Sequence, residues 1–236
     1  LHHRASSAPG RHSKPPTELV ATTINQVYSW DITYLRTLVA GIYFYAYIVL
    51  DIFSRKIVAW EIAETESDVV SAAMMERLDL ECHLRGAHLH SDNGNPMKGA
   101  TMVMTLFRLG VMPSLSRPRV SDDNPFSESL FKTVKYHRTY PGKFGTVAEA
   151  REWFAEFINW YNTVHLHSSI GYVTPAARHQ GSAQATYDKR NQTYAIAQVA
   201  HPERWSKKPK FWAGPETVYL NPSAETKSRL KEAAVA

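Results

Sequence analysis

The chain alternates between short runs of β-branched and aromatic residues and longer segments with a helical pattern. Three strand-like runs come first, joined only by short, turn-prone connections, which is typical of an antiparallel meander. Two further short apolar runs follow, separated by helical patterns. The predicted strands cover residues 25–37, 42–53, 56–64, 87–92 and 111–116.

The helical segments have recognisable ends. Ser67 is suited to cap a helix that extends to about His83, and Gly110 closes the next helix. A third helix begins at Pro125, and a strongly amphipathic one covers residues 146–164. Strands in a meander, followed by alternating strands and helices, predict an α/β protein built on a mixed sheet.

Composition divides the chain into three parts. Residues 1–21 are rich in Pro, Ser, His and basic residues without periodicity, so we expect a flexible basic arm. Residues 22–180 hold the predicted strands and helices and form the core domain. Residues 181–236 form a tail with a short helix and a short strand, too small for a core of its own.

Charge and cysteine content narrow the class of protein. The 236 residues carry a formal net charge of +5, which permits an anionic partner without requiring one. Cys82 is the one cysteine, which excludes an internal disulfide framework and a Cys-rich zinc site. No apolar run reaches the roughly 18–20 residues of a membrane helix. We therefore expect a cytoplasmic, nucleoid-associated protein.

Three carboxylates stand out by position. Asp31 lies in the middle of an aromatic and β-branched strand, where an isolated charge is costly. Asp92 closes the fourth strand, and Glu128 lies near the start of a helix. If the first and fourth strands are neighbours, Asp31 and Asp92 project from one sheet edge and Glu128 leans over them. Such an oxygen site suits Mg²⁺ or Mn²⁺, and two such ions can drive phosphoryl transfer.

Simpler interpretations exist for each acid except Asp31. Asp92 precedes Asn-Gly and is also a natural turn former. Glu128 and Lys132 form an i,i+4 pair, worth only about 0.3–0.5 kcal/mol and common on helices. Asp51 is a possible fourth acid, although an ion pair with Arg55 would explain it. The sequence positions of these acids do not decide between a structural role and a metal-binding role.

Four stretches together resemble the integrase catalytic core of bacterial insertion-sequence transposases of the insertion sequence three family. That family is marked by an Asp, Asp, Glu triad with 35 residues between the last two acids and a basic residue seven positions after the Glu. Asp31, Asp92, Glu128 and Lys135 match this spacing. The stretches are WDIT (30–33), LDIFSRKIVAW (50–60), HSDNG (90–94) and SRPRVSDDNPFSESLFKTVKY (116–136).

The resemblance implies an RNase H-like fold, with a five-stranded mixed sheet flanked by helices. It also implies that Asp31, Asp92 and Glu128 are catalytic and hold divalent metal, two ions of Mg²⁺ or Mn²⁺. The implied reaction is DNA strand cleavage and strand transfer. Lys135 lies two helical turns from Glu128 on the same face and is expected to contact a phosphate near the scissile bond.

Further DNA contacts are predicted around the acids. Asn93 and Asn124 either fix loop geometry or contact DNA, and His90 either stabilises the site or serves the fold alone. Cations around the site would make DNA affinity salt-dependent. The basic residues expected to contact the DNA backbone are Lys132, Arg138, Arg117 and Arg119.

The expected partners follow from the resemblance. They are DNA, as element ends and target, and further copies of the chain in a homo-oligomer. The chain lacks the family's helix-turn-helix and zinc modules, so we expect an upstream helix-turn-helix protein or domain. Two alternatives stay open: an RNase H-like nuclease that does not join strands, and a catalytically idle DNA-binding remnant or truncated regulator.

Overall fold

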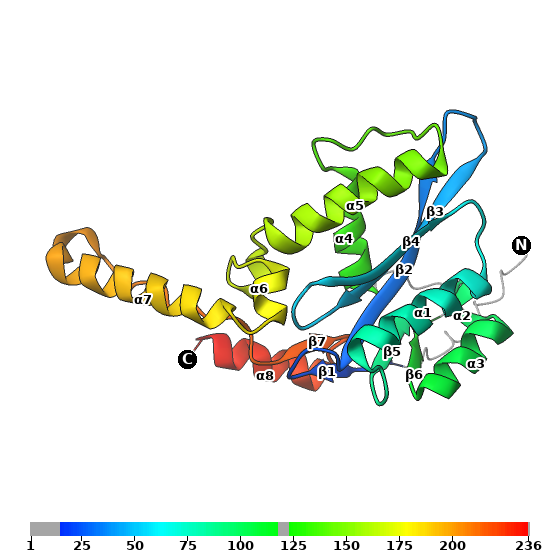
Figure 1. Cartoon of the computed structure of the whole chain (residues 1–236). Coiled ribbons are helices and arrows are strands. Elements are labelled where there is room, and N and C mark those ends of the chain that lie inside the picture. The colour runs from blue at the N-terminus through cyan, green and yellow to red at the C-terminus, as the bar shows by residue number, and fades with distance from the viewer. Residues whose placement is uncertain (1–14, 118–122, 236) are drawn as a thin grey trace, which may run out of the picture.

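A mixed five-stranded sheet forms the centre of the computed structural model, which describes residues 15–117 and 123–235 (Figure 1). The strand order is β4-β3-β2-β5-β6. The first three strands pair antiparallel, and β5 and β6 extend the sheet with parallel pairs. The strands are β2 (Val27–Arg36), β3 (Tyr43–Asp51), β4 (Ile57–Ala63), β5 (His88–Ser91) and β6 (Met112–Leu115).

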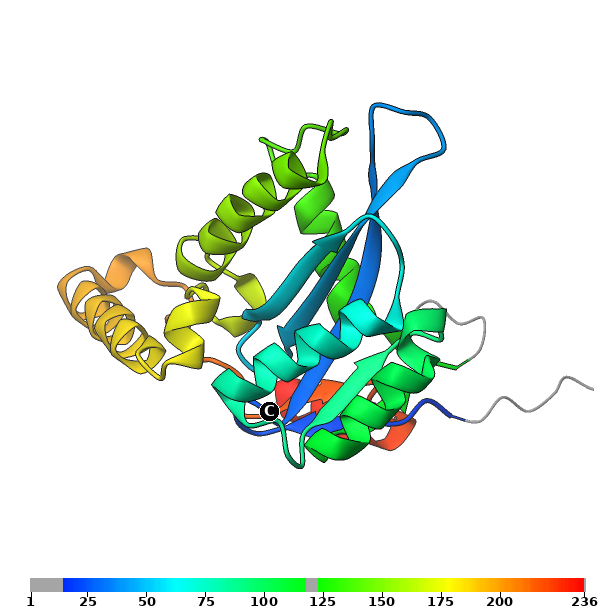
Figure 2. The same cartoon turned by 45° about the vertical axis from the view of Figure 1, so that its right-hand side comes forward.

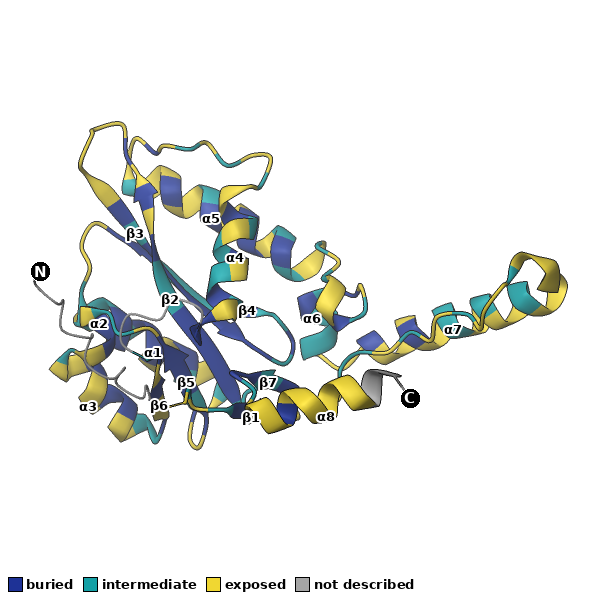
Figure 3. Ribbon diagram, turned by 180° about the vertical axis from the view of Figure 1, so that it is seen from behind, coloured by how far each residue is buried: buried dark blue, intermediate teal, exposed yellow. Residues whose placement is uncertain are grey.

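Helices cover both faces of this sheet (Figures 1 and 2). Tyr28 and Trp30 of β2 belong to an apolar core that includes residues of α1 and α3. Leu35 of the same strand lies in a second core with residues of α4 and α5. Coverage of both faces explains why the central strands are mostly buried (Figure 3). The helices are α1 (Asp68–Cys82), α2 (Asn95–Lys98), α3 (Ala100–Leu109), α4 (Pro125–Lys135) and α5 (Val147–Thr163).

The predicted helix ends are confirmed by their caps. The Ser67 hydroxyl accepts a hydrogen bond from the Val69 N–H at 3.1 Å at the start of α1. Gly110 ends α3 with φ +70°, a left-handed conformation that glycine adopts without strain. Thr146 caps α5 by accepting from the Glu149 N–H at 3.1 Å. The short helix α2, in the connection after β5, was not predicted.

The C-terminal segment returns to the body of the protein. The long helix α7 (Ala183–Ala200) projects away from the sheet, and few of its residues are buried (Figures 1 and 3). The chain then comes back to form β7 (Val218–Leu220), which pairs antiparallel with β1 (Leu19–Ala21). The remaining elements are α6 (Pro175–His179), α8 (Ala224–Val235) and the 3-10 turns η2 (Ser168–Ile170) and η3 (Pro202–Arg204).

Three local expectations need correction. Leu19–Ala21, assigned to the flexible arm, forms β1, since its pairing partner lies some 200 residues away and leaves no local pattern. The helix α8 was not foreseen in the tail. Asp51 is satisfied by hydrogen bonds rather than by an ion pair with Arg55, because its carboxylate accepts from the N–H and hydroxyl of Ser54 and from the N–H of Asn25.

Over residues 15–117 and 123–235, no helix has both the length and the apolar character needed to cross a bilayer.

Candidate active site

Two of the predicted acids lie side by side on neighbouring strands, Asp31 in the middle of β2 and Asp92 directly after β5. β2 and β5 pair in parallel, with Ser29 opposite His90. Asp31 and Asp92 each follow these residues by two positions. Because side chains alternate between faces along a strand, both acids lie on the face that carries Ser29 and His90. The expectation that the first and fourth predicted strands are neighbours is confirmed.

The third acid is placed by the docking of α4 on β2. The Ser29 hydroxyl donates to Asn124 Oδ1 at 2.5 Å and lies 2.7 Å from the Ser127 hydroxyl. Asn124 Nδ2 donates to the carbonyl of Trp30 at 3.2 Å. These buried contacts fix the first turn of α4 beside the middle of β2. Glu128, the next residue after Ser127, is thereby held near Asp31.

The charges of the three acids act on one another. Burial raises the pKa of Asp31 to about 7, and the negative charges of Asp92 and Glu128 add to the increase. A hydrogen bond from the Ile32 N–H, at 2.8 Å, opposes this effect. Glu66, which the sequence did not single out, also raises this pKa. Asp31 therefore lies in a negative, poorly hydrated environment that would favour a bound cation.

The acids are coupled by charge but do not form a closed cluster. Within the described residues, no group of three or more His, Cys, Asp or Glu side chains is arranged to hold a metal ion. Asp92 is exposed, and its Oδ1 accepts from the Gly94 N–H at 2.9 Å, as in the turn-forming role considered above. The donors still suit Mg²⁺ or Mn²⁺, because all three offer carboxylate oxygens and Asp31 carries uncompensated negative charge.

His90 holds the segment directly before α4 against the sheet. It is fully buried, and its Nε2 lies 2.9 Å from the carbonyl of Asp123 while its Nδ1 lies 2.9 Å from the Ser114 hydroxyl. A carbonyl only accepts, so Nε2 carries the proton and Nδ1 accepts from Ser114. Burial lowers the pKa of His90, which keeps the ring neutral. The His90 side chain therefore supports the site indirectly, by fixing the position of the segment that leads into α4.

The segment before α4 is held by two further contacts that the sequence did not reveal. Arg117 donates from Nε and Nη2 to the two carboxylate oxygens of Asp123, both at 2.9 Å. This bidentate pair lowers the pKa of Asp123. Asn221, just after β7, donates to the Asp123 carbonyl at 2.8 Å. The tail thus supports the helix that carries Glu128.

The predicted DNA contacts divide into exposed and internally bonded residues. Asn124 is only 3% exposed and both ends of its amide bond within the protein, which favours its role in fixing local geometry over the predicted DNA contact. Asn93 donates to the Ser116 carbonyl, and Arg117 pairs with Asp123. Arg119 lies outside the described residues. The cations exposed on α4 or just after it are Lys132, Lys135 and Arg138.

Sheet order and acid placement together define a class of protein. A five-stranded mixed sheet with helices on both faces is the RNase H-like architecture of retroviral integrase cores, and solved structures agree with it. The catalytic core domain of BIV integrase matches with a TM-score of 0.50 and 19% identity over 69% of this chain and 99% of that chain. A chain of the simian T-cell lymphotropic virus intasome matches with a TM-score of 0.57 and 13% identity, covering 73% of this chain and 60% of that one.

Sequence comparison places the chain within a family. Two models of the integrase core domain match residues 21–121 and 109–175. The transposase for insertion sequence element IS904 of Lactococcus lactis is 32% identical over 66% of this chain, and transposase InsF for insertion sequence IS3A of Escherichia coli is 26% identical over 73%. The chain belongs to the integrase core domain family, as the resemblance predicted. It spans 61% and 60% of the length of these two relatives.

Proposed function

We propose that this chain is the catalytic core of a DNA transposase that cuts and joins DNA strands in a divalent-metal-dependent reaction. The observation that carries the proposal is the coupling of Asp31 with Asp92 and Glu128 beside the first turn of α4. The names of the curated relatives, which are transposases of insertion sequence elements, support DNA as the substrate.

Each acid has a distinct proposed role. Asp31, from the middle of β2, and Asp92, just after β5, would hold Mg²⁺ or Mn²⁺ between them, and Glu128 would complete the ligand set from α4. Two such ions, when bound, activate an attacking water or 3′-hydroxyl and stabilise the leaving oxygen of a phosphodiester. The contacts of Asn124 with Ser29 and Trp30 hold the first turn of α4 against the sheet, and they would keep Glu128 aligned when substrate binds.

Cations on the same helix are proposed to hold the DNA. Lys135 lies two turns along α4 from Glu128 and would contact a phosphate near the scissile bond. Lys132 and Arg138 are exposed nearby and would extend this contact along the backbone. The proposed partners are element ends and target DNA, further copies of the chain, and an upstream helix-turn-helix protein or domain.

A strand-transfer assay tests this function. A duplex with a pre-cut 3′ end is incubated with target DNA, the chain and Mg²⁺ at low salt. The proposal predicts joined product for the wild type and for Asp188→Asn, an exposed acid on α7, and none for Asp92→Asn. Cleavage without joining would favour the nuclease alternative, and product from Asp92→Asn would refute the metal site.

A further inference from the structure

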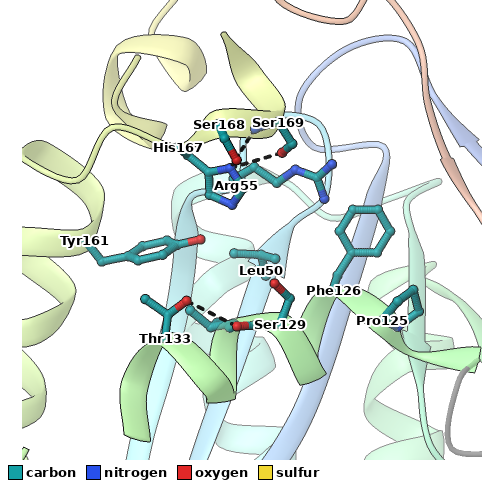
Figure 4. Close-up of a pocket in the computed structure, with 11 residues that line it drawn as sticks. Leu50, Arg55, Pro125, Phe126, Ser129, Thr133, Tyr161, His167, Ser168 and Ser169 are labelled. Carbon is teal, nitrogen blue, oxygen red and sulfur yellow. Dashed lines mark hydrogen bonds between the residues drawn. The ribbon is translucent and has the colours of Figure 1, made fainter. Parts of the chain in front are cut away.

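A second concave site lies on the flank of α4 that meets α5 (Figure 4). It is a cavity of about 300 Å³ between these helices, the β3–β4 turn and η2. Leu50 and Tyr161 are almost fully buried beside it, whereas Ser129 and Ser169 are exposed at its rim. None of the three proposed metal ligands lines this cavity.

Arg55 enters the cavity from the β3–β4 turn. Its backbone is left-handed, with φ +67°, and its N–H donates to the carbonyl of Asp51 at 2.8 Å. The guanidinium lies over the ring of Phe126, 4.2 Å from the ring centroid. The tight turn and the aromatic ring together fix the position of the charge.

Among the residues that the structure describes, one nitrogen of the half-buried Arg55 guanidinium has no hydrogen-bond partner. Nε of Arg55 is buried and has no hydrogen-bond partner among the described residues. Asp51, the nearby acid, uses its oxygens to accept from Ser54 and Asn25. Burial lowers the pKa of Arg55 to about 10, and Tyr161 and Asp51 oppose this shift only in part. A buried N–H donor without a partner is costly unless a ligand accepts its hydrogen bond.

The other polar groups of the cavity can also donate hydrogen bonds. His167 Nδ1 accepts from the Ser169 N–H at 3.3 Å and lies 3.0 Å from the Ser169 hydroxyl, so the ring proton of the neutral form is on Nε2. Burial, with the charge of Arg55, lowers the pKa of His167 to about 4 and keeps the ring neutral. Hydroxyls of Tyr161 and Ser168 also line the cavity, whereas the Thr133 hydroxyl donates to the carbonyl of Ser129 at 3.2 Å (Figure 4). No acidic residue is among the described residues that line the cavity.

We propose that this cavity binds a phosphate group, with Arg55 as its principal ligand. A planar guanidinium can bind two phosphate oxygens at once. Hydroxyls from α4, α5 and η2 line the other sides of the cavity and can bind the remaining phosphate oxygens. This arrangement suits a tetrahedral oxyanion better than a planar carboxylate. The cavity is larger than a phosphate alone and leaves room for part of the group that carries it. That group is either a free phosphate compound or the backbone of DNA.

Inorganic phosphate is the probe for this site. It is titrated calorimetrically into the chain at constant ionic strength, with chloride as the replaced anion. We expect saturable binding of one phosphate per chain, and a dissociation constant raised about tenfold or more by Arg55→Gln, because charge-assisted hydrogen bonds are lost. Arg85→Gln, at an exposed arginine outside the cavity, should bind as the wild type does. Absence of saturable binding, or unchanged affinity in Arg55→Gln, overturns the proposal.

A second variant tests the cavity independently, in case Arg55→Gln does not fold. Ser129→Asp places a carboxylate at the exposed rim, where it can pair with Arg55. We expect a higher unfolding temperature than wild type in phosphate-free buffer and loss of phosphate binding. Unchanged phosphate affinity in this variant contradicts the proposal.

Competition identifies the source of the phosphate. If inorganic phosphate displaces a labelled duplex from the wild type but less from Arg55→Gln, the cavity holds a backbone phosphate. If phosphate binds without changing DNA affinity, the ligand is a free phosphate compound. Either result supports the site. Neither readout requires strand transfer, so the proposal stands or fails separately from the proposed function.

Discussion

Replacing Asp31 by Asn should stabilise the metal-free protein while abolishing its activity. Asp31 is charged in a half-buried position, and Asp92, Glu128 and Glu66 all act against its ionised form. Asn keeps nearly the same shape, and its Oδ1 can still accept the hydrogen bond from the Ile32 N–H. The substitution therefore removes the repulsion and leaves the local contact in place.

The expected magnitude follows from the pKa of Asp31. The pKa rises from an ordinary value of 3.8 to about 7. At about 1.4 kcal/mol per pH unit, this difference corresponds to an upper limit of about 4 kcal/mol. Since the folded protein binds the proton more tightly than the unfolded chain, wild-type stability falls as pH rises from about 4 to 7. The gap between Asp31→Asn and wild type should thus open over this range and be largest above pH 7.

Urea unfolding with a chelator present, at pH 5 and pH 8, measures this gap. We expect Asp31→Asn to be more stable by about 2–4 kcal/mol at pH 8 and by less at pH 5. Added Mg²⁺ should stabilise the wild type and leave Asp31→Asn unchanged. Asp188→Asn should stay within about 0.5 kcal/mol of wild type at both pH values. An Asp31→Asn protein that is no more stable than wild type, or a gap independent of pH, would refute the reasoning.

Three other substitutions test the surroundings of the site. Asn124→Ala should cost about 2–3 kcal/mol of unfolding free energy in a urea titration, because two buried hydrogen bonds to β2 are lost. The control Asn159→Ala, at an exposed position, should cost less than about 0.5 kcal/mol. Equal costs for the two variants would contradict the structural role of Asn124. Arg117→Ala should lower the free energy of unfolding at pH 7, because the bidentate contact with Asp123 is lost. Because Arg117 lowers the pKa of Asp123, that contribution is fully present above the ordinary carboxyl pKa and is lost as pH falls through the lowered pKa of the folded state, so the difference from wild type should shrink as the pH of unfolding is lowered in the acid range. Lys135→Ala should reduce the salt dependence of DNA binding by about one phosphate contact in a fluorescence titration, and an unchanged slope would exclude the contact.

The sequence predicted those features that depend on local pattern. The five strands of the central sheet and the capped starts of its helices were foreseen, and the strand order suggested that the strands of Asp31 and Asp92 are neighbours. Periodicity, turn residues and caps are properties of adjacent residues, so they can be read without knowing the fold. The family resemblance supplied the choice of Glu128 over other acids nearby.

The missed features depend on contacts between distant residues. Asn124 is polar and lies in a polar segment, and only the docking of α4 on Ser29 shows that it is buried. The pairing of β1 with β7 and the hydrogen bond from Asn221 to Asp123 join residues about 200 and 100 positions apart. Arg55 looked like the partner of Asp51 by spacing alone, whereas the turn points it into a cavity.

Anomalous diffraction from crystals grown with Mn²⁺ tests the central claim most directly. We predict a Mn²⁺ peak bridged by the carboxylates of Asp31 and Asp92, with Glu128 turned toward the ions, and loss of that peak in Asp92→Asn. A wild-type crystal with no peak at these carboxylates, or with Mn²⁺ bound only elsewhere, would contradict the proposed metal centre.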